Sequence, residues 1–179
     1  MESEKRNIIN YYHYWEHDAI IADLESKRLP YHIMCCNIHG DFNVGTCIRN
    51  ANAFLASSVL LYGHKKYDKR GTVGTHNYTR FSHVKELESI PNLPLICMDN
   101  VEGAVDITTF EWPKTEFIMV FGEEQIGIPQ DILKLASKVV YIPQLGSVRS
   151  LNVGCASAIA MYDYVSKLPR QVNLPYWFI

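Results

Sequence analysis

Three short stretches of the sequence collect the side chains that could carry chemistry. The first, residues 43–49, holds Asn43, Gly45 and Arg49. Asn43 can cap a helix, Gly45 lets another backbone approach closely, and the planar guanidinium of Arg49 can hold a phosphate through two hydrogen bonds. A lone arginine on a helix is also common as a surface charge. This stretch therefore indicates a functional site only in combination with the other two.

The second stretch, residues 117–129, joins an apolar run to two glycines and two acids. Gly122, Glu124 and Gly127 follow the run, and Pro129 is placed to open a helix. Acidic side chains at the end of a buried strand seldom serve the stability of the sheet. The ordinary alternative is a turn with helix-capping acids.

The third stretch, residues 141–154, leads from an apolar run through a Pro/Gly loop into a long helical pattern. Ser150 and Asn152 fall where that helix should begin. Free backbone N–H groups collect at a helix N-terminus, where short polar side chains and ligands can accept from them. Capping by Ser150 would account for one residue of this loop and leave the rest unexplained.

The elements that must position these stretches alternate along the chain. Near-continuous apolar runs predict parallel strands that are covered on both faces, and helical patterns separate them. We therefore expect a single α/β domain with a mostly parallel sheet and helices on both faces. The predicted strands are 31–37, 58–62, 95–98, 116–121 and 138–142, and the predicted helices are 12–27, 43–56, 131–137 and 151–167.

Composition limits the class of protein. The 179 residues, 47% of them hydrophobic and 20% charged, suit one globular domain. No apolar run is long enough to span a bilayer, and residues 1–17 lack a signal-peptide core, so we expect a soluble cytoplasmic protein. None of the five cysteines forms a C-x-x-C pair, and most lie in apolar runs. This predicts buried free thiols, with neither a disulfide framework nor a zinc site.

Positive charge is concentrated in residues 64–83, although the whole chain carries −2. Five basic side chains stand there against the single acid Asp68, which gives this segment +4 and the remainder −6. Local charge matters more than the total for contacts with phosphates, and a solvated surface loop is the alternative. The candidate nucleic-acid-binding residues are Lys65, Lys66, Lys69, Arg70 and Arg80.

Together and in this order, the three stretches resemble the motifs of the SpoU/TrmH family of RNA 2′-O-ribose methyltransferases. The family patterns are N-x-G-x-x-x-R, then G-x-E-x-x-G after a strand, then I-P followed by S-L-N. The resemblance spans about residues 31–167. The chain departs from the family pattern in three places: Gly40-Asp41 stands for Asp-Pro, Leu55 for a glycine after the first helix, and Glu123 for Ser or Thr. The matching residues are Asn43, Gly45, Arg49, Gly122, Glu124, Gly127, Ile142, Pro143, Ser150, Leu151 and Asn152.

The resemblance implies a fold, a cofactor and partners. It implies a C-terminal deep trefoil knot whose loops cradle S-adenosylmethionine without a metal, and a homodimer acting on tRNA or rRNA, with tRNA favoured. It places Arg49 near the ribose 2′-hydroxyl from the partner subunit, with Asn43, Glu124, Ser150 and Asn152 completing the catalytic site. The implied cofactor-binding residues are Gly122, Glu124, Gly127, Ile142, Leu145, Ser150 and Leu151.

Other interpretations remain open. The string from His13 to His17 matches the H-x-x-E-H pattern of inverzincin metalloproteases if both histidines share one helix face, although no third ligand follows. A catalytically inactive module that keeps the fold and binds RNA is the second alternative. We also expect three parts: a helical extension over residues 1–30, the methyltransferase domain over 31–168, and an aromatic tail over 169–179.

Overall fold

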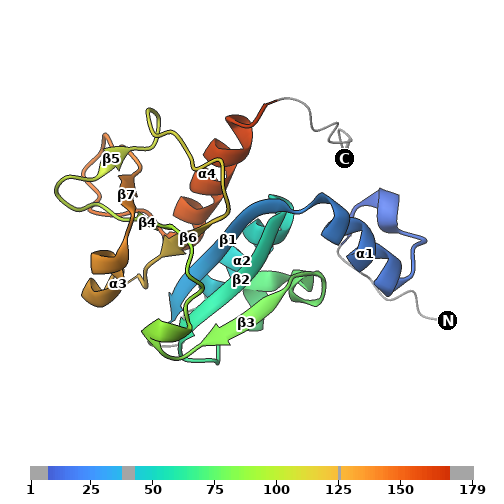
Figure 1. Cartoon of the computed structure of the whole chain (residues 1–179). Helices are drawn as coiled ribbons and strands as arrows, with labels where there is room; N and C mark the ends of the chain where they lie inside the picture. Colours follow the sequence, from blue (N-terminus) through green and yellow to red (C-terminus); the bar gives the residue numbers. More distant parts are fainter. Residues whose placement is uncertain (1–7, 38–42, 125, 170–179) are drawn as a thin grey trace.

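A seven-stranded sheet forms the centre of the protein in a computed structural model that describes residues 8–37, 43–124 and 126–169 (Figure 1). The strand order is β3-β2-β1-β6-β4-β7-β5, and neighbouring strands are parallel throughout. The strands are β1 Leu29–Asn37, β2 Ala56–Gly63, β3 Phe81–Val84, β4 Leu95–Met98, β5 Val105–Asp106, β6 Phe117–Phe121 and β7 Lys138–Tyr141. The α-helices are α1 His17–Lys27, α2 Asn43–Ala53, α3 Gln130–Leu135 and α4 Val153–Ser166, and four short 3₁₀ helices are η1 Asn10–Tyr12, η2 Lys69–Thr72, η3 Thr75–Tyr78 and η4 Leu87–Ser89.

The five predicted strands are confirmed as β1, β2, β4, β6 and β7. Every residue of β6 is buried, as expected for a central parallel strand that is covered on both faces. β3 and β5 were not predicted. β3 and β5 are the two edge strands, and neither contains an apolar run.

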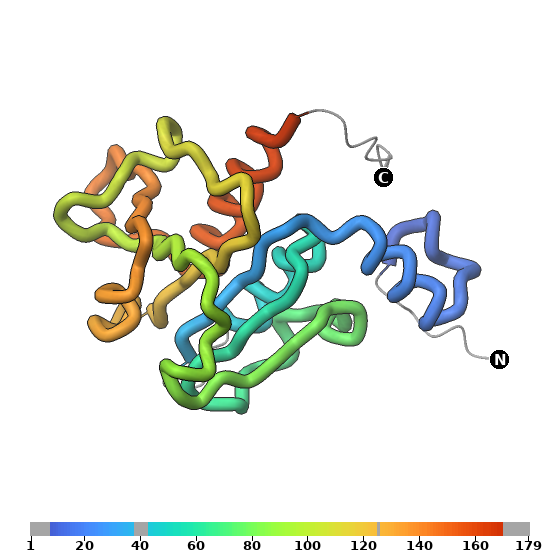
Figure 2. The backbone as a smooth tube through the Cα atoms, in the orientation of Figure 1, coloured from blue at the N-terminus to red at the C-terminus, as the bar shows by residue number. Residues whose placement is uncertain are grey.

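Helices cover both faces of the sheet, as predicted. On one face, α2 and α4 pack through Ile48 and Met161 against a core that includes Ile33. On the other face, Ile132 of α3 packs against Met34. Figures 1 and 2 show α2 running behind β1 and β2, with α4 beside β6. None of the described helices is long and apolar enough to cross a membrane.

The predicted helix over residues 43–56 ends earlier, because Ala56 already begins β2. The chain reverses at Leu55, whose φ of 55° lies in the left-handed region. A residue with a Cβ pays roughly 1–2 kcal/mol for that conformation. The Leu55 carbonyl accepts a hydrogen bond of 2.8 Å from the Leu29 N–H, so the turn also fixes the start of β1. This conformation gives a physical reason for the glycine that the family pattern carries here.

The predicted N-terminal helix over residues 12–27 is wrong in its first part. Tyr12 ends η1, and α1 begins only at His17. The Tyr12 hydroxyl donates to the Asp23 carboxylate, which folds the short 3₁₀ turn back on α1. His13 and His17 therefore do not share a helix, and no cluster of three potential metal ligands occurs among the described residues. The metalloprotease interpretation loses its geometric basis.

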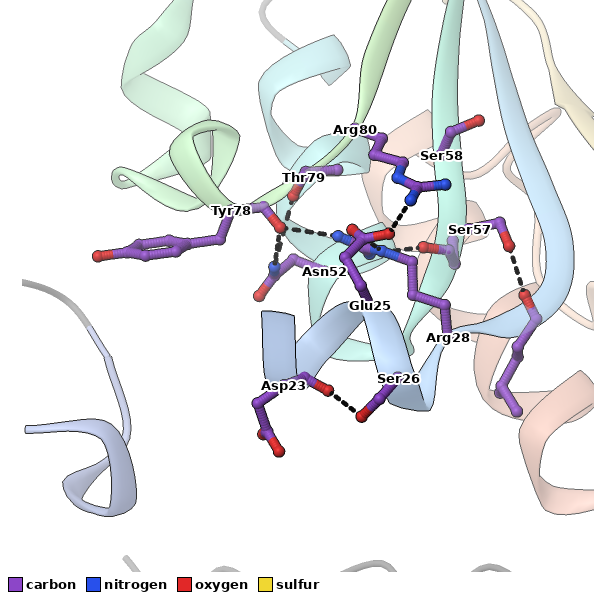
Figure 3. Close-up of polar contacts among 12 residues, drawn as sticks. Asp23, Glu25, Ser26, Arg28, Asn52, Ser57, Ser58, Tyr78, Thr79 and Arg80 are labelled. Atoms are coloured by element: carbon purple, nitrogen blue, oxygen red, sulfur yellow. Dashed lines mark hydrogen bonds and ion pairs between the residues drawn. The ribbon is translucent and has the colours of Figure 1, made fainter. Parts of the chain in front are cut away.

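A polar cluster attaches α1 to the sheet edge (Figure 3). The Arg28 guanidinium, with a side chain only 5% exposed, donates to the carbonyls of Ala56 and Tyr78 at 2.8 and 2.9 Å and to Glu25 at 2.6 Å. Arg80 pairs with the same Glu25 carboxylate at 2.5 Å. The proposed division of the chain at residue 30 stays a prediction. β1 itself begins at Leu29, and most of the aromatic tail lies outside the described residues.

The connection between β4 and β6 follows an unusual route. It leaves β4, forms β5 at the far edge beyond β7, and returns across α4 to β6 (Figure 2). Lys167, the C-cap residue of α4, donates to the Ile107 carbonyl at 2.6 Å, and the Trp112 indole donates to Asp163 of α4 at 2.8 Å. The β4–β6 connection therefore contacts two later parts of the chain, β7 through β5 and the C-terminal half of α4.

Candidate functional site

A cavity of about 120 Å³ opens at the carboxyl ends of β4, β6 and β7, against the start of α4. Ligands of open α/β sheets bind at this edge, because the loops that leave the parallel strands converge there. The cavity is lined by Met98, Asp99, Asn100, Phe121, Gly122, Glu123, Glu124, Gly127, Val140, Ile142, Gln144, Ser150, Leu151, Val153 and Ala156.

A chain of hydrogen bonds joins the three stretches beside this cavity. The Asn43 amide donates to Glu124 Oε2 at 2.9 Å, and the Asn152 amide donates to Asn43 Oδ1 at 2.9 Å. Asn152 Oδ1 in turn accepts from the backbone N–H groups of Gly154 and Cys155, at 2.9 and 3.3 Å. Each amide thereby has a fixed orientation, with its donor and acceptor atoms both engaged.

Local sequence explains why α4 begins where it does. Asn152 is the N-cap residue of α4, so the cap predicted for this region is supplied by Asn152. α4 then packs closely on α2, since a Cβ at Gly154 would lie 2.8 Å from Thr46 Cγ2. Asn50 of α2 completes the seam by donating to the Gly154 carbonyl and to Ser157 Oγ, both at 2.9 Å.

The loop after β6 is built around its two glycines. A Cβ at Gly122 would lie 2.2 Å from the carbonyl carbon of Gly127, so only glycine fits there. Gly127 has φ 74°, and its backbone exchanges two hydrogen bonds with Glu123, of 2.8 and 3.0 Å. This reversal presents the next residue, Glu124, to Asn43. The same steric rule confirms the close approach predicted at Gly45, where a Cβ would meet the Asp68 carbonyl oxygen at 2.7 Å.

The charge of the cavity is negative. Asp99, Glu123 and Glu124 line it, and no lysine or arginine does among the residues that the structure describes. Glu123 is only 6% exposed. A cavity of this kind favours a ligand that carries positive charge and has amino groups able to donate hydrogen bonds. The geometry is also compatible with a ligand held through backbone groups, since Gly122 and Gly127 expose their main chain there.

Six of the seven predicted cofactor-binding residues line the cavity; the seventh, Leu145, does not. Its side chain is fully exposed, at 102%. The cavity also contains Asp99, Asn100 and Gln144, which sequence reasoning missed. Asp99 and Asn100 follow β4 as Glu124 follows β6, so the rule that sites gather at the carboxyl ends of strands could have found them.

Arg49 lies apart from its own chain's cavity. It is exposed on α2, and it forms no hydrogen bond or ion pair with any residue in the described ranges. Arg49 comes one helical turn after Gly45, and residues four apart share a helix face. Because Gly45 packs against residues 68–72, Arg49 faces the side of α2 that adjoins the basic segment.

The basic segment 64–83 folds over α2 through η2 and η3. Asn37 anchors its start by donating to the carbonyls of His64 and Lys66, at 2.6 and 2.9 Å. The five basic residues are exposed, but they are not equivalent. Arg70 binds the Asp68 carboxylate, and this pairing raises the pKa of Arg70 and lowers that of Asp68. Arg80 is paired with Glu25, which leaves the lysines as the sources of uncompensated charge.

Comparisons with known proteins agree with the geometry. A model of the SpoU rRNA Methylase family matches residues 30–162. The tRNA (guanosine(18)-2′-O)-methyltransferase of Escherichia coli K12 is 25% identical over 155 residues, which cover 81% of this chain and 67% of the relative.

Two solved structures share the fold. The AdoMet-bound rRNA methyltransferase from Sinorhizobium meliloti has a TM-score of 0.69 at 23% identity, over 82% of this chain and 60% of that one. The TrmH/SpoU tRNA modifying enzyme of A. aeolicus has a TM-score of 0.71 at 20% identity, over 84% of this chain and 83% of that one. This chain thus spans less than two thirds of the Sinorhizobium protein.

Proposed function

The chain belongs to the SpoU rRNA methylase family, and from this premise we propose that it transfers a methyl group from S-adenosylmethionine to a ribose 2′-hydroxyl of RNA. One observation carries the proposal. Glu124, Asn43 and Asn152 come from three separate stretches, and they form one hydrogen-bonded chain at the mouth of an acid-lined cavity. The comparison proteins named as RNA methyltransferases support the reaction class.

The residues of the cavity fit the cofactor. Gly122, Ile142 and Leu151 would hold its adenosine part through backbone groups, and Asp99, Glu123 and Glu124 would complement its positive charge. When bound, S-adenosylmethionine supplies a methyl group on a sulfonium, which is already an excellent methyl donor. The protein's own task is therefore to recruit and align the acceptor. We propose that this site works without a metal.

A ribose 2′-hydroxyl is a poor nucleophile until its proton is being removed, so the enzyme must orient the oxygen and assist deprotonation. A guanidinium has no acceptor atom, so Arg49 is unsuited to act as a general base. We assign it to the RNA phosphate next to the target ribose, with the phosphate or a water accepting the proton. Its guanidinium can donate hydrogen bonds to two phosphate oxygens and so hold the neighbouring ribose in position. Ser150 at the cavity completes the proposed catalytic set.

The position of Arg49 supports a homodimer in which each active site takes its arginine from the partner. Arg49 is exposed and does not line its own chain's cavity, whereas Asn152 is bonded to Asn43, the partner of the cavity residue Glu124. Arg49→Ala should lower methyl transfer by about 100-fold or more, because a misalignment of about 1 Å costs that much. Affinity for the cofactor should stay within about twofold of the wild-type value. Arg49→Lys should also lose methyl transfer, because a lysine ammonium cannot form the two parallel hydrogen bonds of a planar guanidinium.

Heterodimers test the shared site directly. Mixing inactive Arg49→Ala chains with inactive Asn152→Ala chains should restore partial activity, since one of the two sites in each heterodimer is then intact. Mass photometry would verify that mixed dimers form. Mixed dimers without activity would place Arg49 and Asn152 in the same subunit's site, and a protein that stays monomeric would contradict the dimer itself.

The substrate we propose is tRNA, with rRNA as the second candidate. The E. coli relative is named for tRNA, and the Sinorhizobium structure is named for rRNA. Either RNA would be met in the cytoplasm, where we place the protein. The basic segment, through Lys65, Lys66 and Lys69, would contact the phosphate backbone on the side that Arg49 faces. Mapping ribose methylation in total RNA with and without the gene would identify the target.

We also propose that the C-terminal part is threaded into a trefoil knot. The strand order supports this, because β7 is inserted between β4 and β5 while the β4–β6 connection packs against the end of α4. Pulling the unfolded chain from both ends should leave it shorter than its full contour length by the segment held in the tightened knot. Extension to the full contour length would contradict threading.

A catalytically inactive RNA-binding module is the alternative. The intact chain of Asn43, Glu124 and Asn152 favours an enzyme, since RNA binding alone gives no reason for these three residues to meet at a cavity. Calorimetry with S-adenosylmethionine and with its demethylated product S-adenosylhomocysteine decides the matter. Micromolar binding of both supports the enzyme. Absence of binding by well-folded protein would refute the proposed function.

A further inference from the structure

One buried polar atom in the cavity wall has no partner. The side-chain oxygen Oε1 of Gln144 is inaccessible to solvent and accepts no hydrogen bond from any described residue. Buried side-chain oxygens in folded proteins almost always have a donor, because leaving one unpaired costs roughly 1–3 kcal/mol. It is the single such side-chain atom among the residues that the structure describes.

Gln144 lies where a bound ligand could supply the missing hydrogen-bond donor. Gln144 lines the proposed cofactor cavity and also a neighbouring cavity of about 370 Å³. Asn100 and Ile142 are the other residues that both cavities share. Asn100 does not donate to Gln144 Oε1, and its amide is directed toward the Arg149 carbonyl at 3.4 Å. Ile142 offers no polar side chain.

We infer that Gln144 is a specificity-determining residue whose side-chain carbonyl accepts a hydrogen bond from an amino group of the bound cofactor. The inference rests on the proposed function and adds a side-chain contact to a site otherwise built from backbone groups and carboxylates. S-Adenosylmethionine carries two such groups, the exocyclic amine of adenine and the α-ammonium of its amino acid part. Both are N–H donors, and the test separates them.

The test is a cycle in which the protein acceptor and the ligand donor are removed in turn. Gln144→Met keeps the length of the side chain and removes the acceptor. Gln130→Met, at an exposed position at the start of α3, is the matched control. The ligands are S-adenosylhomocysteine, its analogue with hydrogen in place of the adenine amine, and its analogue with hydrogen in place of the α-amino group. Affinities come from calorimetry, so the readout does not depend on catalysis.

Gln144→Met should weaken S-adenosylhomocysteine binding by about 3- to 10-fold, the usual range for one buried hydrogen bond, while Gln130→Met leaves it unchanged. One of the two analogues should bind the wild type more weakly than S-adenosylhomocysteine does, by at least the same factor. Gln144→Met should not weaken the binding of that analogue any further. That analogue identifies the amine. Additive losses for both analogues would overturn the inference, because the acceptor and the donor would then act independently.

Thermal melting of the unliganded variants excludes a structural role. Because the Gln144 oxygen has no partner without ligand, Gln144→Met should melt no lower than the wild type. A clearly lower melting temperature would show that Gln144 supports the fold, and it would overturn the inference. If the wild type binds no S-adenosylhomocysteine at all, the proposed function fails, an outcome distinct from wild-type binding with no effect of Gln144→Met.

Discussion

The hydrogen-bonded chain from Glu124 to Asn152 can be broken at a single atom. Asn43→Asp replaces the amide N–H that meets Glu124 with a carboxylate oxygen of the same size, and it keeps the oxygen that accepts from Asn152. The side chain at position 43 is only 7% exposed, so the new charge cannot turn into solvent without disturbing the start of α2. Asn43→Asp therefore tests whether the polarity of this contact matters.

The size of the effect follows from the geometry. Losing a hydrogen bond to a charged group costs about 1.5–3 kcal/mol. Two unit charges at the observed 2.9 Å would repel by about 6 kcal/mol at an effective dielectric constant of about 20. Glu124 is exposed, so solvent screening and side-chain movement should remove much of that repulsion. We expect a net loss of about 2–4 kcal/mol in the free energy of unfolding at neutral pH.

Urea unfolding followed by circular dichroism measures this loss, and calorimetry with S-adenosylhomocysteine measures the accompanying loss of affinity. The decisive variant is the double substitution Asn43→Asp with Glu124→Gln, which reverses donor and acceptor. It should recover at least half of the lost stability, whereas Glu124→Gln alone should cost about 1–2 kcal/mol.

Equal stability of the wild type and Asn43→Asp at neutral pH would refute the reasoning. So would a double variant that shows the simple sum of the two single losses, since a direct contact requires coupling between them.

Three further predictions concern the glycine loop, the basic segment and the thiols. Gly122→Ala should abolish S-adenosylhomocysteine binding and lower stability by about 1–3 kcal/mol, since its Cβ would overlap the Gly127 backbone; Gly146→Ala, with open space around it, should be neutral in melting and calorimetry. Replacing Lys65, Lys66 and Lys69 with Ala should flatten the salt dependence of RNA binding by about 2–3 units, whereas replacing the exposed lysines 114, 134 and 138 should not. Native protein should expose one fast-reacting thiol, which Cys155→Ser removes. The other four cysteines are at most 3% exposed, and burial raises the pKa of Cys97 to about 12. Several thiols that react at similar rates would contradict this.

The central strands and the glycine loop that lines the cavity could be predicted because their signals are local. A strand that is covered on both faces needs an unbroken apolar run, and β6 has one. Likewise, Gly122 and Gly127 are required by the tight reversal after β6, so the sequence must show them at fixed spacing. The same locality explains why Asn152 could be placed at the start of a helix.

Features that depend on distant contacts could not be predicted. The N-terminal helix breaks before His17 because Tyr12 turns back to bond Asp23, a tertiary contact that outweighs the helical pattern. β5 is two residues long and owes its existence to backbone pairing with β7. The exposure of Leu145 and the unpaired oxygen of Gln144 arise from the path of one loop, for which the sequence carries no periodic signal.

The place of β7 between β4 and β5 has a consequence for how the protein is made. β1, β2 and β3 are consecutive in the chain and adjacent in the sheet, so they can assemble while synthesis continues. The half of the sheet with β4 and β5 cannot assemble in the same way. These two strands pair only through β7, which is synthesised after every other described helix and strand except α4. Until then, the edge of β4 that pairs with β7 stays open to water and to other chains. We expect the newborn polypeptide to depend on chaperones late in translation, and truncation before residue 138 to yield an aggregating product in place of a smaller folded domain.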